Sequence, residues 1–174
     1  KPSFKEAVAL YQSFVNQKTF PSDWLRFIKL KLVQQLGIDP QQAVNTVLLG
    51  KNNQPPAVYF MAAADQSKLI LSVLDTADYG YNVYYIYARY LEAYSYLRGK
   101  NYKMYTTAKQ LLHEALLKEQ DAAFVLHALG LVAEYQDDFP LAEKYYRQAI
   151  ELIPTWTYPR SSLGNALRDQ NRYT

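Results

Sequence analysis

The stretch AFVLHALGLVAEYQDDFPLAEKYYRQAIELIPTW, residues 123–156, is one unit of a 34-residue repeat. Its positions recur one period before or after, with Ala108 matching Ala142, Leu112 matching Tyr146, Ala115 matching Ala149 and Leu129-Gly130 matching Leu163-Gly164. A fixed period of this length is typical of one supersecondary unit stacked on copies of itself, here a helix–turn–helix. The repeat therefore predicts an all-α stack of antiparallel helix pairs, and the grooves of such a stack can bind other chains.

The composition excludes several kinds of site. The chain has 174 residues, enough for one domain or a short array, and it has no Cys, so it forms neither a disulfide nor a thiolate metal site. No apolar run approaches the roughly 18 residues of a membrane-spanning helix, and we expect no membrane partner. Because the chain starts at Lys1 without Met and ends abruptly at Arg172-Tyr173-Thr174, we expect a piece of a longer protein.

The charge distribution is only mildly basic. The net charge is +3, and residues 1–36 hold six basic residues against Glu6 and Asp23. Spread over helical segments, this excess is more typical of a solvated surface than of a nucleic-acid footprint. A nucleic-acid-binding helical domain therefore remains an alternative that we do not favour.

Capping signals and apolar spacing predict about nine helices and no strand. Ser3 and Glu6 predict a capping box at the first helix, and Ser22 is expected to cap the second. The apolar face of the second helix is predicted at Leu25, Ile28, Leu32 and Leu36, widened by Trp24 and Phe27.

The remaining helices are delimited mainly by Gly and Pro. A third helix is expected to start at Asp39-Pro40, with Pro40 at its first position and Gln42 completing a capping box, and to end at Gly50 before a loop over residues 51–56. The others are predicted over residues 57–77, with a possible break near Asp65, and over 82–97, 103–117, 122–135, 140–152 and 159–168.

Residues 123–156 resemble a tetratricopeptide repeat. The resemblance rests on Leu126, Leu129, Gly130, Ala142, Tyr146, Ala149 and Pro154. Small side chains at Gly130 and Ala142 allow the two helices of a pair to cross closely, and Tyr146 fills the space between one pair and the next. The sequence departs from the family where Ala133 replaces its usual aromatic residue.

The resemblance divides the chain into regions. Residues 86–122 look like a degenerate copy, with a three-residue insertion around Asn101–Tyr105, and residues 157–174 look like a half repeat or a capping helix. Residues 1–80 are a helical region of diverged repeats or an unrelated cap, and 81–174 are the repeat-like part. The last helix lacks its partner helix, so self-association through this open C-terminal face is possible.

Candidate binding residues follow from the resemblance, because the first helix of each pair faces inward in such stacks. Ten of the 17 Tyr lie between Tyr79 and Tyr105, and Tyr is common at interfaces. The inward side is expected to carry Tyr87, Tyr94, Phe124, His127, Leu131, Ser161, Asn165 and Arg168, with Glu134 beside them. Asn165 and Arg168 resemble part of the family's carboxylate clamp, but His127 and Leu131 stand where further polar donors belong, so an apolar or mixed peptide is the expected ligand.

The sequence contains no recognisable catalytic or metal site. The two histidines, His113 and His127, have no further ligands at helical spacing, and no phosphate loop or nucleophile motif occurs. We therefore expect no enzyme, no metal and no cofactor. The favoured function is a protein–protein interaction scaffold that binds a peptide or protein, and the alternative is a regulatory or substrate-docking segment of a larger enzyme.

Overall fold

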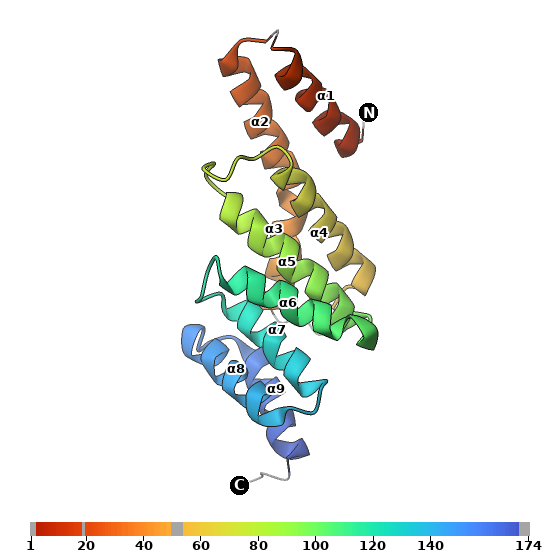
Figure 1. Cartoon of the computed structure of the whole chain (residues 1–174). Helices are drawn as coiled ribbons and strands as arrows, with labels where there is room; N and C mark the ends of the chain where they lie inside the picture. The colour runs from red at the N-terminus through yellow and green to blue at the C-terminus, as the bar shows by residue number, and fades with distance from the viewer. Residues whose placement is uncertain (1–2, 19, 50–53, 171–174) are drawn as a thin grey trace.

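The molecule is an elongated stack of helices with the two chain ends at opposite ends (Figure 1). The computed structural model describes residues 3–18, 20–49 and 54–170. Within them the regular structure is all helical, in nine α-helices and one short 3₁₀ turn: α1 Phe4–Gln17, α2 Ser22–Leu36, α3 Ile38–Leu48, α4 Ala57–Leu71, α5 Tyr81–Arg98, η1 Tyr102–Met104, α6 Tyr105–Leu116, α7 Ala123–Glu134, α8 Phe139–Leu152 and α9 Thr157–Asp169. This confirms the predicted all-α class.

The helix starts show which capping signals act. The capping box of α1 is present, because the Glu6 backbone N–H donates to Ser3 Oγ and the Ser3 N–H donates to Glu6 Oε2. The predicted cap of α2 is wrong, since Pro21 precedes the helix and Ser22 is its first residue. The prediction for α3 is also wrong: Gly37 caps it without a side-chain hydrogen bond, and Pro40 is its third residue.

Two further predictions are corrected or left open. The helix expected over residues 57–77, with a break near Asp65, is continuous as α4 but ends at Leu71. The predicted helix end at Gly50, residues 51–53 of the predicted loop, and the termini at Lys1 and 172–174 lie outside the described residues.

The repeat residues pack as the resemblance implies. Tyr146 of α8 is fully buried and lies over Gly130 of α7, where an added Cβ would collide with its ring. The same ring packs in a cluster with Ala166 of α9, so it fills the space between one pair and the next. The insertion predicted between α5 and α6 coincides with η1.

The core runs along the stack rather than around a centre. Each helix packs chiefly on its neighbours in the chain, most extensively α4 on α5, α5 on α6, α7 on α8 and α8 on α9. The predicted apolar face of α2 packs toward α1 and α4. Trp24 and Phe27 do not widen it, because their side chains are 64% and 59% exposed.

Candidate partner-binding site

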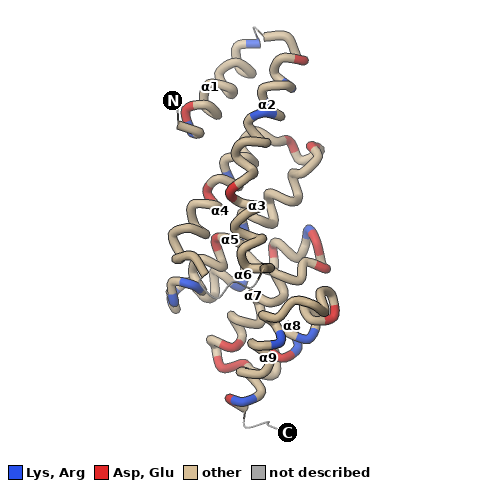
Figure 2. The backbone as a smooth tube through the Cα atoms, turned by 180° about the vertical axis from the view of Figure 1, so that it is seen from behind, with Lys and Arg blue, Asp and Glu red and all other residues tan. Residues whose placement is uncertain are grey.

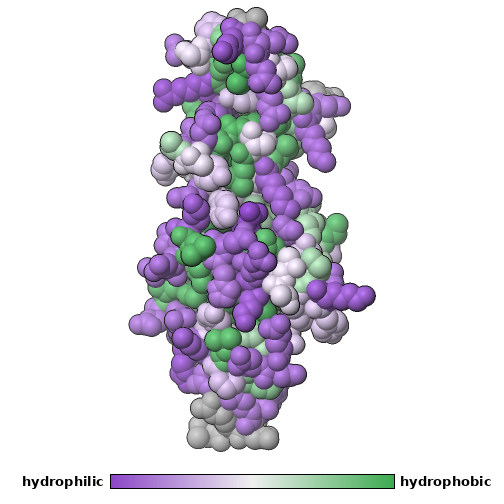
Figure 3. All heavy atoms as spheres, viewed as in Figure 1, coloured by the Kyte–Doolittle hydropathy of each residue, from purple (hydrophilic) through white to green (hydrophobic). Residues whose placement is uncertain are grey.

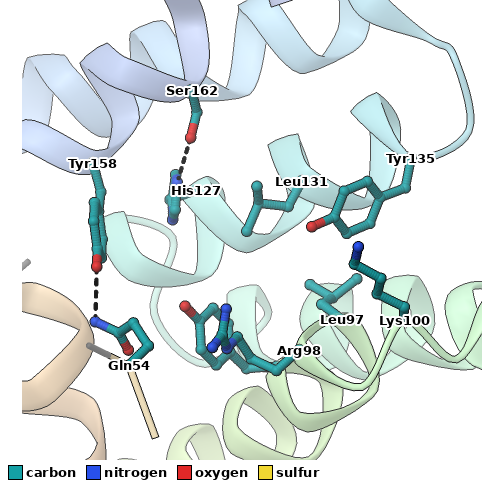
Figure 4. A pocket seen from close by; sticks show the side chains of 10 residues that line it. Gln54, Leu97, Arg98, Lys100, His127, Leu131, Tyr135, Tyr158 and Ser162 are labelled. Atoms are coloured by element: carbon teal, nitrogen blue, oxygen red, sulfur yellow. Dashed lines mark hydrogen bonds between the residues drawn. The ribbon is translucent and has the colours of Figure 1, made fainter. Parts of the chain in front are cut away.

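One pocket of about 310 Å³ lies where the first helices of successive pairs converge (Figure 4). The lining residues of α7 and of α9 are four positions apart, and those of α5 lie three and four positions after Tyr94, which places each set on one helix face. The lining residues are Tyr94, Leu97 and Arg98 of α5 with Lys100 just after it, His127 and Leu131 of α7 with Tyr135 at its C-cap, Tyr158 and Ser162 of α9, and Gln54 before α4.

Aromatic rings and two hydrogen bonds hold one wall of the pocket in place. The His127 ring lies with its centroid 5.0 Å from that of Trp156 and 5.6 Å from that of Tyr146. His127 Nε2 is 3.1 Å from Ser162 Oγ, which ties α7 to α9. Gln54 Nε2 donates to Tyr158 OH at 2.9 Å, so the segment before α4 is joined to α9.

The opposite wall is positively charged. Arg98 and Lys100 extend toward α7 (Figure 4), and no lining residue is Asp or Glu. Neither cation forms an ion pair with any residue that the structure describes. Burial raises the pKa of Tyr94 and of Tyr135, and the Arg98 charge acts in the opposite direction on both. The pocket therefore combines apolar surface, hydroxyl groups and uncompensated positive charge.

The structure brings together only part of the predicted set. Tyr94, His127 and Leu131 line the pocket. Tyr87 and Phe124 do not; their ring centroids are 6.4 Å apart and they pack between α5 and α7.

The residues predicted on the last helix lie elsewhere. Ser161, Asn165 and Arg168 are exposed and do not line the pocket, and Arg168 Nε is 3.3 Å from Asp169 Oδ1. The resemblance to a carboxylate clamp at Asn165 and Arg168 therefore does not extend to their placement.

Sequence reasoning missed the other seven lining residues, Gln54, Leu97, Arg98, Lys100, Tyr135, Tyr158 and Ser162, and for α9 the reason is geometric. The inward-facing positions of α9 were predicted by adding one 34-residue period to those of α7. This procedure selects Ser161 as the equivalent of His127. Across the gap between α7 and α9 the residue that faces His127 is Ser162, one position after the equivalent Ser161. The spacing of four residues from Tyr94 to Arg98 and from Tyr158 to Ser162 was the available signal.

The close approach of His127 and Ser162 is a poor basis for nucleophilic catalysis. Burial lowers the pKa of His127 to about 3, so its ring is a weak proton acceptor at neutral pH. Its Nδ1 is buried and has no hydrogen-bond partner, whereas catalytic dyads orient this atom with a third group. The described residues contain no cluster of three or more His, Asp or Glu suited to a metal ion.

Comparison with known proteins bears on the fold. No protein-family model and no curated protein sequence matches the chain. Among solved structures the chain is similar to the MamA protein, with a TM-score of 0.50 and 18% identity over 97% of this chain and 85% of that chain. The likeness supports the all-helical repeat fold.

The helices are also unsuited to crossing a bilayer. None of those in the described part of the chain is both long enough and apolar enough to form a membrane span.

Proposed function

We propose that this chain is a non-catalytic protein-interaction module that binds a segment of a partner protein across α5, α7 and α9. The observation that carries the proposal is the convergence of these three first helices on one pocket. Apolar contacts, hydroxyl groups and positive charge occur there together, and binding sites combine these features when they fix both the position and the orientation of a ligand.

The lining residues favour a segment with an apolar side chain next to an acidic one. The half-buried Leu131 and the 41% exposed Tyr135 provide apolar contacts, and an aliphatic or aromatic side chain would bury surface against them. A carboxylate of the partner would pair with Arg98 and Lys100, which lack acidic partners within the described residues. Charge-assisted hydrogen bonds to Arg are among the stronger polar contacts and also fix orientation.

The protonation of the polar groups that line the pocket favours a non-catalytic role. The one histidine at the pocket is held neutral by burial, and its neighbour Ser162 has no other base in the lining. Arg98 and Lys100 are cations, and the pocket lining contains no Cys, Asp or Glu beside them that could act as a nucleophile. These groups can bind and orient a ligand, and catalysis would require an activated nucleophile or base that the lining lacks.

A peptide-display selection on the intact chain tests the proposal. We expect enriched peptides to carry an acidic residue within a few positions of a large apolar one. Leu131→Asp is expected to weaken their binding at least tenfold, because it places a charge on the apolar wall.

The matched control is Leu152→Asp on α8, which makes the same substitution outside the pocket and should leave binding unchanged. Circular dichroism establishes that both variants fold. Should Leu131→Asp fail to fold, Arg98→Glu replaces it, since Arg98 is exposed. A selection that enriches no peptide, or peptides that bind the pocket variants as well as the original chain, would refute the proposed function.

A further inference from the structure

The outward side of α2 carries large apolar side chains that are exposed to solvent. Trp24, Phe27 and Leu30 are 64%, 59% and 60% exposed. Their spacing of three residues places them along one side of the helix, while the other side packs toward α1 and α4. We call these three residues the α2 apolar strip. Figure 3 shows apolar atoms among hydrophilic ones over this end of the molecule.

Basic side chains border the strip. Lys31 Nζ lies 5.8 Å from the centroid of the Phe27 ring, and Arg26 lines the same hollow as Leu30. Lys18 is the C-cap of α1, at the turn that leads to α2. Asp23 is the one acidic residue within α2, and Figure 2 shows basic residues on both helices of this end. Asp23 lies at the strip beside Trp24 and Phe27, and Lys29 is paired with Asp75 and Asp78, so the basic excess at the strip comes from Arg26 and Lys31.

We propose that the α2 apolar strip and its basic neighbours bind the surface of an anionic lipid bilayer. Trp and Phe favour the boundary between headgroups and acyl chains. Lys and Arg beside them gain from the negative potential of anionic lipids. Such a contact lies in the plane of the bilayer surface and requires no membrane-spanning helix, so the proposal replaces the expectation of no membrane partner, which rested on the lack of a spanning segment. It occurs at the end of the stack that carries the N-terminus, away from the pocket of the proposed function (Figure 1).

The surroundings of the strip argue against a second copy of this chain. In a two-fold dimer the same surface patch forms both sides of the interface, so the basic residues Arg26 and Lys31 of both protomers would be gathered at that interface. The hollow beside Trp24 and Phe27 measures about 230 Å³ and is lined by these two residues and Asp23. It is a shallow feature on a convex helix, which suits a lipid surface better than a docked helix.

The experiment measures binding of the whole chain to phosphatidylcholine vesicles with and without phosphatidylserine. Trp24 is a built-in reporter, because the chain has two Trp and Trp156 is only 4% exposed. We expect co-sedimentation with the anionic vesicles, a blue shift of Trp emission and weaker binding at higher salt. Neutral vesicles should bind much less.

Variants separate the apolar and the charged contributions. Phe27→Ser with Leu30→Ser, and separately Arg26→Gln with Lys31→Gln, are each expected to reduce vesicle binding by about tenfold or more. Leu117→Ser and Lys144→Gln are the matched controls, since both residues are exposed and lie outside α1 and α2. They should bind as the original chain does.

Three results would overturn the proposal. The first is the absence of binding to anionic vesicles, or equal binding by the original chain and the strip variants. The second is concentration-dependent dimerisation in the ultracentrifuge that Phe27→Ser abolishes, which would assign the strip to a second copy. The third is a Trp24 emission shift caused by an acidic amphipathic peptide and not by vesicles, which would assign the strip to a protein partner.

Discussion

Two glycines one repeat apart, Gly130 and Gly164, have opposite surroundings. A Cβ at Gly130 would collide with the ring of the buried Tyr146, whereas nothing lies within 4 Å of a Cβ added at Gly164. Gly within a helix costs about 1 kcal/mol of stability relative to Ala. The aromatic ring above Gly130, and not the helix itself, therefore accounts for the need for glycine at that position.

This pair gives a prediction with its own control. Gly130→Ala is expected to lower the free energy of unfolding by about 1–3 kcal/mol, because Tyr146 must move within a filled core. Gly164→Ala should leave it unchanged or raise it by up to about 1 kcal/mol. Urea denaturation measures both. Equal effects of the two substitutions would contradict the packing described for Tyr146.

His127 makes the stability depend on pH in a defined direction. Burial lowers its pKa in the folded chain to about 3, against about 6.5 in an unfolded chain. Below about pH 6.5 the unfolded state therefore binds a proton that the folded state does not. The stability contributed by this residue is complete above that pH and is lost as the pH falls toward 3.

We expect this loss to appear as a difference between the original chain and His127→Gln. From pH 6.5 to pH 4.5 the free energy of unfolding of the original chain should fall by on the order of 2 kcal/mol more than that of the variant. The measurement is urea denaturation at several pH values, in which the carboxylates contribute alike to both proteins. Parallel pH profiles would show that His127 is not held neutral by the fold.

Among the helices, α1 and α2 differ in how they begin. Ser3 closes a reciprocal capping box, whereas Ser22 makes no capping hydrogen bond. Ser3→Ala should therefore weaken the first turn of α1 by about 1 kcal/mol and speed its amide hydrogen exchange, while Ser22→Ala should leave exchange in α2 unchanged. Faster amide exchange in α2 after Ser22→Ala would show that Ser22 does cap α2.

The sequence predicted the helices best where several local signals agree. The repeat-bearing helices α7 and α8 start and end within about a residue of their predicted limits. At α8 the signals are local, because Asp138 caps its start, Pro140 lies in its first turn and Pro154 follows its end. The start of α3 was mispredicted because Gly37 ends one helix and begins the next without a loop. Trp24 and Phe27 were assigned to the core because hydropathy alone does not distinguish a buried from an exposed apolar residue.

At the scale of the whole molecule, the stack was predictable and the pocket only partly so. The 34-residue period specifies which helices are neighbours. It does not specify which side of each helix faces the gap, and so Ser162 rather than Ser161 lines the pocket. The contribution of Gln54 depends on a hydrogen bond to Tyr158, 104 residues away in the chain, and no local pattern predicts such a contact.

The central claim is that the pocket between α5, α7 and α9 binds a partner segment through apolar and acidic contacts. Calorimetric titration of one selected peptide tests it most directly, with the original chain, Arg98→Glu, Lys100→Glu and the control Lys144→Glu on α8. We expect each pocket variant to weaken binding by about tenfold or more and Lys144→Glu to leave it unchanged. Replacing the peptide's acidic residue with its amide should remove the difference between the variants. Equal affinity of all four proteins for the peptide would contradict the account.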